Sequence, residues 1–357
     1  MRKPHCLKIA HLHVADKNNK GDFAIVLAVQ ELLRANFPGC KIIDYSVQLL
    51  KTGELNDAKE INQADLVVIG GGGIIYSYFL PYSLEFIKAL TPPIVIFGVG
   101  YIKEIGAPNL SREAVRSVMA LVGKASAVGV RDFKTKEFLI KNGINTAKVK
   151  VVGDPAALLS EKKPVLAVLK KLGLDKKNKK IKIGLNLNYS GWLGFGKWRE
   201  DILRSYRDMT EYFIKEYGGT GGPGVEIYYL KHHPGENNIY PELKIKNLKV
   251  VDLKPAEQKY VYGQLDLVIG MMLHSGVMAF GAGTPEISVA YDLRNYSFAE
   301  FIKCPELVVD LDKLKKGELL KRAKLVFNKR SNYQRKFIEI KERINKAQGK
   351  FLKELYV

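Results

Sequence analysis

Short apolar segments of strand length alternate with helical patterns along almost the whole of this 357-residue chain. Strands that alternate with helices form βαβ units, and such units build parallel sheets that carry helices on both faces. The predicted strands of the first half are 7–12, 41–44, 66–69, 94–97, 127–130 and 149–152. Those of the second half are 181–187, 226–230, 248–252, 265–269 and 287–290. The alternation predicts an α/β fold with two doubly wound parallel-sheet, Rossmann-like domains that face a cleft.

Local signals place the ends of several helices between these strands. Asp22 is predicted to cap a helix over 23–36, because a short acidic side chain can accept hydrogen bonds from the first free amides of a helix. A second helix is expected to begin after Ser111. A third is expected over 133–142, with Gly143 in the position that commonly follows a helix.

The composition changes between the two series of strands. Residues 161–180 are dense in lysine, so we expect a basic linker there, between a first domain of residues 1–160 and a second of 181–312. Residues 313–357 are expected to form a basic amphipathic helical tail. Its apolar residues recur at steps of three and four: Phe337, Ile340, Ile344, Ala347, Phe351 and Leu355. The stripe predicts packing against the domains, and attachment to a membrane surface is the alternative.

The chain is strongly basic, with 57 lysines and arginines against 37 acidic residues and a formal net charge of +20. Three explanations of this charge are possible: a generally lysine-rich composition, attraction to an anionic membrane or substrate, and binding of nucleic acid. Nucleic acid is the least expected partner, since no recognised nucleic-acid module is present. No apolar run approaches the roughly 20 residues that span a bilayer. Three scattered cysteines and no secretory segment near residues 1–6 predict a cytoplasmic protein, with the inner face of the cell membrane as a further place of work.

The stretch from Asp65 to Ile75 is the most distinctive local feature: an apolar run that leads into four consecutive glycines, residues 70–73. Glycine lets a backbone turn sharply and approach another group closely. Ligands of open α/β sheets bind beyond the carboxyl ends of the strands, where such a loop is expected to lie. The glycines therefore predict a binding site, and a tight turn without a ligand is the alternative.

Polar residues follow other predicted strands of the first half. Asn19, Gly21 and Asp22 come after the first strand, and Asp22 is a possible general base for a sugar hydroxyl. Gly100, Arg131 and Asp154 each follow a later strand. Pairing with neighbouring loops, or holding the two halves in register, is the structural alternative for the two charged residues.

In the second half, His274 lies where a strand gives way to a helix. An imidazole at a helix start can face an anion that the helix amides attract, so His274 is a candidate proton donor. Lys231 follows another strand and can supply positive charge. The adjacent His232 and His233 cannot both point the same way on a strand, and no metal-ligand spacing is present, so no metal is expected.

Taken together, these segments resemble the polysaccharide pyruvyl transferase family. The matching segments appear in the family's order: 19–22, 65–73, 98–100, 130–132, 154–155, 273–274, 283–285 and 291–292. The resemblance implies a GT-B-like fold whose first domain binds the acceptor and whose second binds the donor. It implies a transferase that adds a pyruvyl ketal from phosphoenolpyruvate to sugar hydroxyls of a cell-envelope polysaccharide or its lipid-linked precursor. Phosphoenolpyruvate is then a co-substrate, and no cofactor is expected.

The resemblance also implies roles for individual residues. His274 and Asp22 are the catalytic pair, and the donor-binding residues are Leu273, His274, Lys231, Asn188 and Lys197. The acceptor-binding residues are Asn19, Gly21, Gly71, Gly72, Gly73, Gly100, Arg131 and Asp154.

The chain departs from the family pattern at two places on the donor side. Met272 stands where the family typically has the arginine of an Arg-Leu-His motif, and the segment 186–188 lacks an arginine that the family often has. Arginine binds phosphate and carboxylate with paired hydrogen bonds, which a lysine such as Lys197 or Lys231 cannot reproduce in full. Two alternatives therefore remain: a GT-B-like glycosyltransferase that uses a nucleotide sugar, and an inactive glycan-binding relative.

Overall fold

The structure is a computed structural model, which describes residues 6–14, 16–104, 106–176, 178–188, 196–219 and 221–356. The first five residues, on which the absence of a secretory segment was judged, lie outside the described residues. The chain divides into two compact units. Unit 1 comprises Met1–Lys17, Asp22–Leu159 and Glu342–Val357, and unit 2 comprises Asn18–Gly21 and Ser160–Lys341.

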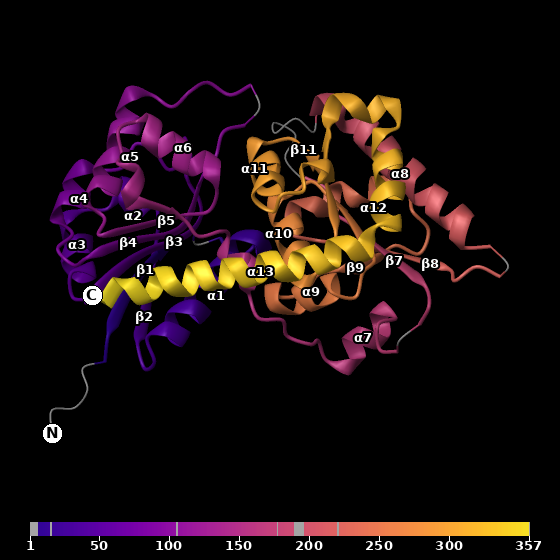
Figure 1. Cartoon of the computed structure of the whole chain (residues 1–357), viewed down its shortest axis with the longest axis horizontal. Coiled ribbons are helices and arrows are strands. Elements are labelled where there is room, and N and C mark those ends of the chain that lie inside the picture. Colours follow the sequence, from indigo (N-terminus) through magenta and orange to yellow (C-terminus); the bar gives the residue numbers. More distant parts are fainter. Residues whose placement is uncertain are drawn as a thin grey trace. The chain divides into compact units, whose positions relative to one another are not determined.

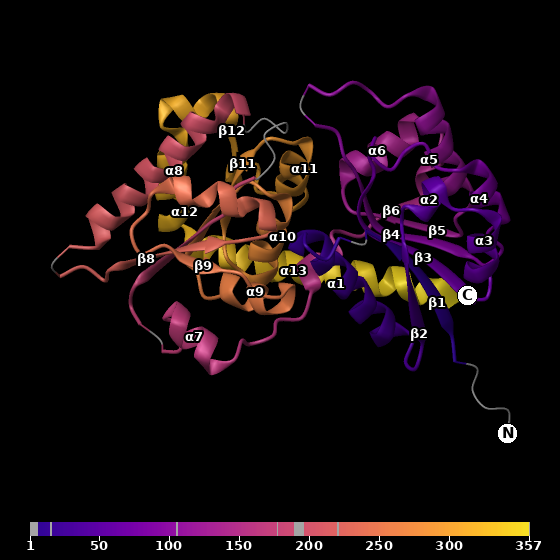
Figure 2. The same ribbon diagram turned by 180° about the vertical axis from the view of Figure 1, so that it is seen from behind.

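Unit 1 contains a parallel sheet of six strands, in the order β2-β1-β3-β4-β5-β6. The strands are β1 (Lys8–His13), β2 (Lys41–Ser46), β3 (Leu66–Ile75), β4 (Ile94–Tyr101), β5 (Ala127–Val130) and β6 (Val149–Val151). The order can be followed in Figure 2. The central strand β3 is buried along its whole length, as expected for a strand covered on both faces.

The helices of unit 1 follow the strands in alternation (Figure 1). They are α1 (Lys20–Asn36), α2 (Leu49–Thr52), α3 (Leu55–Ile61), α4 (Leu84–Ala89), α5 (Arg112–Lys124), α6 (Phe133–Lys141) and the short 3₁₀ turns 146–148 and 155–158. Ser111 caps α5 through the amide of Ala114, and Asp132 caps α6 through the amide of Thr135. The predicted start at Ser111 is confirmed.

Unit 2 contains a second parallel sheet of six strands, in the order β12-β11-β10-β7-β8-β9. The strands are β7 (Ile181–Leu185), β8 (Val225–Leu230), β9 (Lys249–Val251), β10 (Leu267–Gly270), β11 (Glu286–Ala290) and β12 (Val308–Asp310). The three-residue strand β12 was not predicted. The chain builds β7, β8 and β9 outwards on one side of β7 and then returns to pair β10 with the other side of β7. The order of the strands therefore reverses between β7 and β10.

The helices of unit 2 are α7 (Leu166–Leu172), α8 (Gly196–Tyr217), α9 (Pro255–Tyr262), α10 (Leu273–Ala282), α11 (Leu293–Phe301), α12 (Glu318–Asn328) and the first part of α13 (Arg330–Lys353). Short 3₁₀ turns lie at 234–238, 240–243, 305–307 and 311–316, and another ends the chain at 354–356. Two doubly wound parallel sheets with flanking helices confirm the predicted α/β fold class.

The segments predicted as linker and tail are built into the units. The longer segment of unit 2 runs from Ser160 to Lys341, so the lysine-rich residues 161–180 belong to this unit. They carry α7, and position 177 among them lies outside the described residues. Helix α13 contributes residues up to Lys341 to unit 2 and those from Glu342 to unit 1. Four members of the predicted stripe are buried: Phe337, Ile340, Ile344 and Phe351. Packing thus accounts for the apolar face of this helix.

Two local predictions are wrong. Helix α1 begins at Lys20, so Asp22 lies inside its first turn and does not cap it; the side chain of Asn19 instead accepts a hydrogen bond from the Gly21 amide at 3.1 Å. The four glycines do not form a loop after a strand. Strand β3 continues through them to Ile75 and pairs with β4 at Gly70 and Gly72.

Candidate functional site

The carboxyl edge of the unit 2 sheet, between β7 and β10, is where a doubly wound sheet binds its ligand. The buried side chain of Asn186 lies at this point. Its Oδ1 accepts a hydrogen bond from the Met272 amide at 3.1 Å, and its Nδ2 donates to the Leu230 carbonyl at 3.0 Å. One amide group therefore fixes the ends of three neighbouring strands. Asn188, a predicted donor ligand, is buried two residues further along.

Helix α10 begins at this edge. Met272 occupies its N-cap position and no side chain caps the helix, so the amides of its first turn are not satisfied by a capping side chain. The partial positive charge of these amides favours an anion. The predicted donor residues Leu273 and His274 are the first two residues of α10, and both are buried.

The segment Asn18–Gly21 packs against the start of α10. A Cβ atom on Gly21 would lie 2.6 Å from both Cβ and Cγ of His274, so only glycine fits beside this imidazole. The Lys20 amide donates to the His232 carbonyl at 3.0 Å, which fastens the segment to the end of β8. Asn19 and Gly21, predicted to bind the acceptor, thus belong to unit 2, and Gly21 packs against His274, which was predicted to bind the donor. Asp22 is the next residue of the chain.

Two lysines share one carboxylate at the same edge. Lys20 Nζ lies 2.6 Å from Asp252 Oδ1, and Lys231 Nζ lies 2.6 Å from Asp252 Oδ2. Lys20 also donates to Gln258 Oε1 at 3.0 Å. Burial lowers the pKa of Lys20, and the hydrogen bond to Asp252 opposes that shift. Two ammonium groups and one carboxylate leave the cluster with a net positive charge. Lys20 and Asp252 were not predicted as site residues.

Glu236 supports the loop that carries these groups. Its Oε1 accepts from the amides of His232 and His233, and its Oε2 accepts from the Tyr229 hydroxyl at 2.7 Å and from Asn186 Nδ2 at 3.3 Å. Burial raises the pKa of this carboxyl to about 8, although the hydrogen bonds act in the opposite direction. Glu236 therefore holds the end of β8 against the end of β7.

A second buried network leads from this loop into the domain. His232 Nε2 lies 2.7 Å from the Tyr262 hydroxyl, which donates to Ser275 Oγ at 3.0 Å, and Ser275 donates to Glu286 Oε2 at 2.6 Å. Burial lowers the pKa of His232 well below its ordinary value and raises that of Glu286 well above. Burial therefore favours the uncharged form of both groups. The network fixes Ser275, the neighbour of His274, to α9 and β11.

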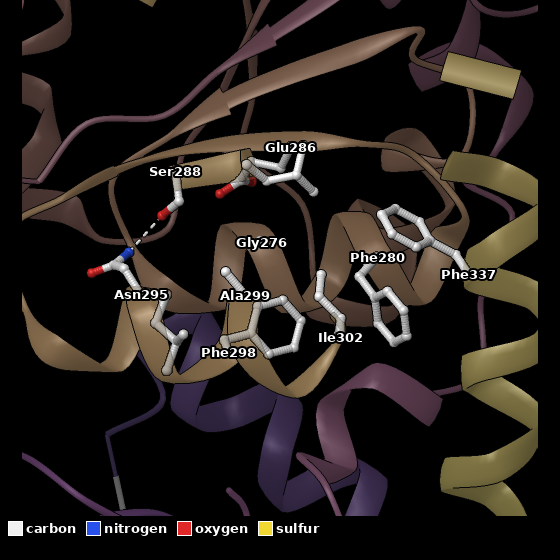
Figure 3. Close-up of a pocket in the computed structure, with 11 residues that line it drawn as sticks. Gly276, Phe280, Glu286, Ser288, Asn295, Phe298, Ala299, Ile302 and Phe337 are labelled. Atoms are coloured by element: carbon white, nitrogen blue, oxygen red, sulfur yellow. Dashed lines mark hydrogen bonds between the residues drawn. The ribbon is translucent and has the colours of Figure 1, made fainter. Parts of the chain in front are cut away.

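Figure 3 shows a cavity on the inner side of α10, with Phe280 and Phe337 on one side and Glu286, Ser288 and Asn295 on the other. Its volume is about 20 Å³. This is room for about one water molecule, so the cavity does not admit a sugar or phosphoenolpyruvate.

The glycines predicted to bind the acceptor in unit 1 are used for internal packing. A Cβ on Gly71 would collide with Ile25 of α1, and one on Gly73 would collide with Ile102. Gly71 and Gly72 also have positive φ angles of 74° and 88°. These glycines let helices and loops approach β3 closely, so the structure explains them without a ligand.

Gly100, Arg131 and Asp154 do come together at the carboxyl edge of the unit 1 sheet. The Arg131 guanidinium lies where a Gly100 side chain would be, with Nη1 3.4 Å from Asp154 Oδ2 and Nε 3.5 Å from Asp132 Oδ2. All three charged residues are buried. Asp154 also caps the following turn through the Ala156 amide at 2.9 Å. The cluster joins the ends of three strands.

A cavity of about 250 Å³ that sequence reasoning missed lies beside these strand ends in unit 1. It is lined by residues after β3 and β4, among them Tyr76, Tyr101 and Glu104. The Tyr76 hydroxyl donates to Glu104 Oε1 at 2.5 Å, and the Tyr101 ring stacks on Phe138 with centroids 4.3 Å apart. Burial raises the pKa of the Tyr101 hydroxyl. The sequence signal for this cavity is a tyrosine at the end of each of two neighbouring strands, Tyr76 after β3 and Tyr101 as the last residue of β4.

The remaining donor-side cations differ in their surroundings. Lys197 is exposed near the start of α8, with its ammonium 5.3 Å from the centroid of the Trp198 ring. Arg199 forms a bidentate ion pair with Glu242, through its Nε and its Nη2. In the part of the chain that the structure describes, no hydrogen bond or ion pair joins Lys197 to α10. Lys231 is the predicted cation that reaches the strand edge.

The fold and these strand-edge sites define the class of protein: a two-unit α/β protein of the GT-B type. It is similar to solved structures with low sequence identity. UDP-GlcNAc 2-epimerase of Methanocaldococcus jannaschii, in complex with UDP-GlcNAc and UDP, is 14% identical, with 90% of this chain and 93% of that one covered and a TM-score of 0.56. HepE of Anabaena, in complex with UDP and glucose, is 11% identical, with 98% and 99% covered and a TM-score of 0.58.

A third similar structure is the UDP-forming trehalose-phosphate synthase of Burkholderia vietnamiensis, at 12% identity, 100% and 97% coverage and a TM-score of 0.56. The chain itself belongs to the polysaccharide pyruvyl transferase family, whose pattern it matches over residues 19–292. It is accordingly a transferase by class. No curated protein matches it. Among the described residues, no helix is both long enough and apolar enough to cross a membrane.

Proposed function

We propose that this protein transfers a pyruvyl group from phosphoenolpyruvate to two hydroxyls of a sugar, forming a cyclic ketal and releasing phosphate. The observation that carries the proposal is the donor-side edge of unit 2. There His274 lies in the first turn of α10, Gly21 packs against it, and Lys20 and Lys231 share Asp252 nearby at the strand ends.

The chemistry requires positive charge for the donor and a proton for its carbon. One hydroxyl oxygen of the sugar adds to C2 of phosphoenolpyruvate while the methylene carbon takes up a proton and becomes a methyl group. The second hydroxyl oxygen then displaces phosphate from C2, and its proton leaves with the phosphate. We assign the proton donor for the methylene carbon to His274 and the acceptor of the hydroxyl proton to Asp22.

The arginines typical of the family are replaced in function by the two lysines and the helix start. Each charge-assisted hydrogen bond contributes about 1.5–3 kcal/mol. Lys20 and Lys231 supply two ammonium groups, each about one-eighth exposed, and Asp252 leaves a net charge favourable to a phosphate or carboxylate. Asp252 is half exposed, so an anion can exchange for one of its oxygens at an ammonium group without burying the aspartate.

The acceptor is a sugar of a cell-envelope polysaccharide or of its lipid-linked precursor, and the 250 Å³ cavity of unit 1 is its binding site. Tyrosine rings pack against the C–H faces of sugars, and the carboxylate of Glu104 can accept hydrogen bonds from hydroxyls. The net charge of +20 suits work at the anionic inner face of the membrane.

The test follows phosphate release by phosphorus-31 NMR, with phosphoenolpyruvate and a panel of envelope-type disaccharides. We expect release only when both substrates are present, and none from His274→Ala. The matched control is His233→Asn, a histidine whose side chain caps a turn. Because Asn keeps a capping acceptor, this variant should remain active. Loss of activity in the control alone, or full activity in His274→Ala, would contradict the assignment.

A nucleotide-sugar glycosyltransferase is the second candidate. Met272 and Asn188 stand where the family has arginines, and two similar structures are described as complexes with UDP. In a thermal-shift screen, stabilisation by UDP or GDP without any by phosphoenolpyruvate would establish this candidate in place of the first. Glycan binding without turnover of either donor would identify an inactive relative.

A further inference from the structure

Three possible metal ligands meet on one face of the unit 1 sheet, and none of them is assigned a role above. His11 and His13 are two residues apart on β1, so their side chains point to the same face. Asp44 of β2 is the register partner of His11, which places its side chain on that face as well. One ligand atom from each residue lies within 4.8 Å of the others.

The tautomer of His13 leaves a lone pair facing the carboxylate. Its Nδ1 lies 3.0 Å from the Val14 carbonyl oxygen, which can only accept, so Nδ1 carries a proton. In the neutral ring Nε2 is then an acceptor, and it lies 3.1 Å from Asp44 Oδ1, another acceptor. Two acceptors at this distance repel each other unless a cation or a further proton lies between them.

His11 supplies the second observation. It is fully buried, and within the described residues neither ring nitrogen makes a hydrogen bond of ordinary geometry. A Cβ added to Gly70 would lie 2.4 Å from its Nε2, and its Nδ1 lies 3.9 Å from Asp44 Oδ1. A fully buried imidazole whose ring nitrogens make no hydrogen bond of ordinary geometry requires an explanation, and a bound ion is one.

We propose that His11 Nδ1, His13 Nε2 and Asp44 Oδ1 ligate a divalent transition-metal ion of the zinc class. Two imidazoles and one carboxylate are a common set for such ions. Tetrahedral zinc with bonds of about 2.0–2.1 Å needs ligand atoms roughly 3.4 Å apart. The separations of 3.1 and 3.9 Å from Asp44 Oδ1 bracket this value, and all three ligand atoms lie within 4.8 Å of one another, so side-chain rotations can bring them to it.

The surroundings also fit a metal site. Metal-bound histidines usually donate their other N–H to a carbonyl, as His13 does to Val14, and bound carboxylates are themselves hydrogen-bonded. Gln30 Nε2 donates to Asp44 Oδ1 at 2.7 Å. The Asp44 side chain is 58% exposed, which gives the ion a path from solvent and leaves room for a water ligand.

One nearby charge acts against the ion. The guanidinium of Arg34 donates to Gln30 Oε1 at 3.3 Å, and Gln30 in turn donates to Asp44, so a positive charge lies near the site. It reduces the affinity but does not occupy the lone pairs. A bound ion would tie the end of β1 to β2, four residues before the segment Asn18–Gly21 begins. The ion would thus stabilise unit 1, and this role does not depend on which donor the enzyme uses.

The experiment uses the full chain without a histidine tag, stripped with EDTA and titrated with Co²⁺, whose visible absorption reports its ligands. We expect one Co²⁺ per chain, displaced by Zn²⁺. Asp44→Asn and His13→Gln should each weaken binding at least tenfold. Asp208→Asn, an exposed aspartate of α8, is the matched control and should bind as the parent does.

The outcome is decisive in either direction. Because Asp44 is largely exposed, its variant is expected to fold, and a circular dichroism spectrum checks this. Failure to bind Co²⁺ and Zn²⁺ with one-to-one stoichiometry overturns the proposal and leaves a proton shared between His13 and Asp44. Binding that persists in both variants also overturns it. Neither result bears on phosphate release from phosphoenolpyruvate.

Discussion

Replacement of Gly21 by alanine tests whether His274 is held in place by the segment that precedes Asp22. The new Cβ would lie 2.6 Å from Cβ and Cγ of His274. These atoms are close to the helix backbone, so they cannot move aside as a flexible side-chain end would. The φ angle of Gly21 is not in the left-handed region, so the backbone itself tolerates alanine. Any loss of stability therefore comes from this contact.

The magnitude follows from two opposing effects. Overpacking of a buried contact costs about 1–3 kcal/mol. Alanine is favoured over glycine in a helix by up to about 1 kcal/mol, and less in a first turn. We expect a net loss of about 1–2 kcal/mol for Gly21→Ala. The matched control is Gly123→Ala in α5, where no atom lies within 4 Å of the added Cβ. That variant should gain about 0.5–1 kcal/mol.

Differential scanning calorimetry of both variants measures the effect. For a domain of this size, 1 kcal/mol corresponds to a change of about 2–4 °C in Tm. The two variants should therefore shift in opposite directions. Displacement of the His274 ring should also reduce phosphate release from phosphoenolpyruvate in Gly21→Ala alone. If Gly21→Ala is as stable as Gly123→Ala, the contact between Gly21 and His274 is loose and does not hold the imidazole in place.

Three further outcomes are expected. Lys20→Met and Lys231→Met should each weaken phosphoenolpyruvate binding about ten- to a hundredfold in calorimetric titration, since each removes one charge-assisted hydrogen bond; unchanged affinity would exclude them as donor ligands. Phe351, in the part of α13 that belongs to unit 1, stacks on Phe97 of the sheet, so Phe351→Ala should lower the free energy of unfolding by about 3–5 kcal/mol. Ile338 is 59% exposed on the same helix, so Ile338→Ala should be nearly neutral. Equal effects of the two substitutions would argue against packing as the role of the stripe. The pKa of Glu236 is raised to about 8, so the folded state holds a proton that the unfolded state loses near pH 4.3. The free energy of unfolding should therefore fall as the pH rises from about 5 to 8 and then level off. In urea unfolding, Glu236→Gln should show a flatter dependence of this free energy on pH.

The fold class could be predicted because buried parallel strands have a local signal. Each is a short run of aliphatic residues, and most predicted strands lie within two residues of those observed. Strand β12 was missed, although the equally short strands β6 and β9 were predicted. The end of β3 was missed for a physical reason: glycine is a local signal for a turn, but Gly71 and Gly73 are glycines because Ile25 and Ile102 occupy the space beside them. That cause lies far away in the sequence.

The site could be predicted only in part. His274 was recognisable because a polar residue at a strand-to-helix junction is visible in the sequence, and its assigned role stays a proposal. Lys20 lies between two residues that were named, yet its partner Asp252 is 232 positions away and nothing local joins them. The histidines on β1 were passed over for the same reason, since only the register of β1 with β2 brings Asp44 to them.

The division of the chain has a consequence for how the protein can be dissected. The backbone passes from one unit to the other after residues 17, 21, 159 and 341. A fragment that starts at residue 160 would lack the glycine neighbour of His274 and the amine that pairs with Asp252. A fragment that stops at residue 159 would lose the stacking of the Phe351 ring on Phe97. A chimaera that exchanges units between relatives would therefore need to take residues 18–21 together with unit 2 and residues 342–357 together with unit 1.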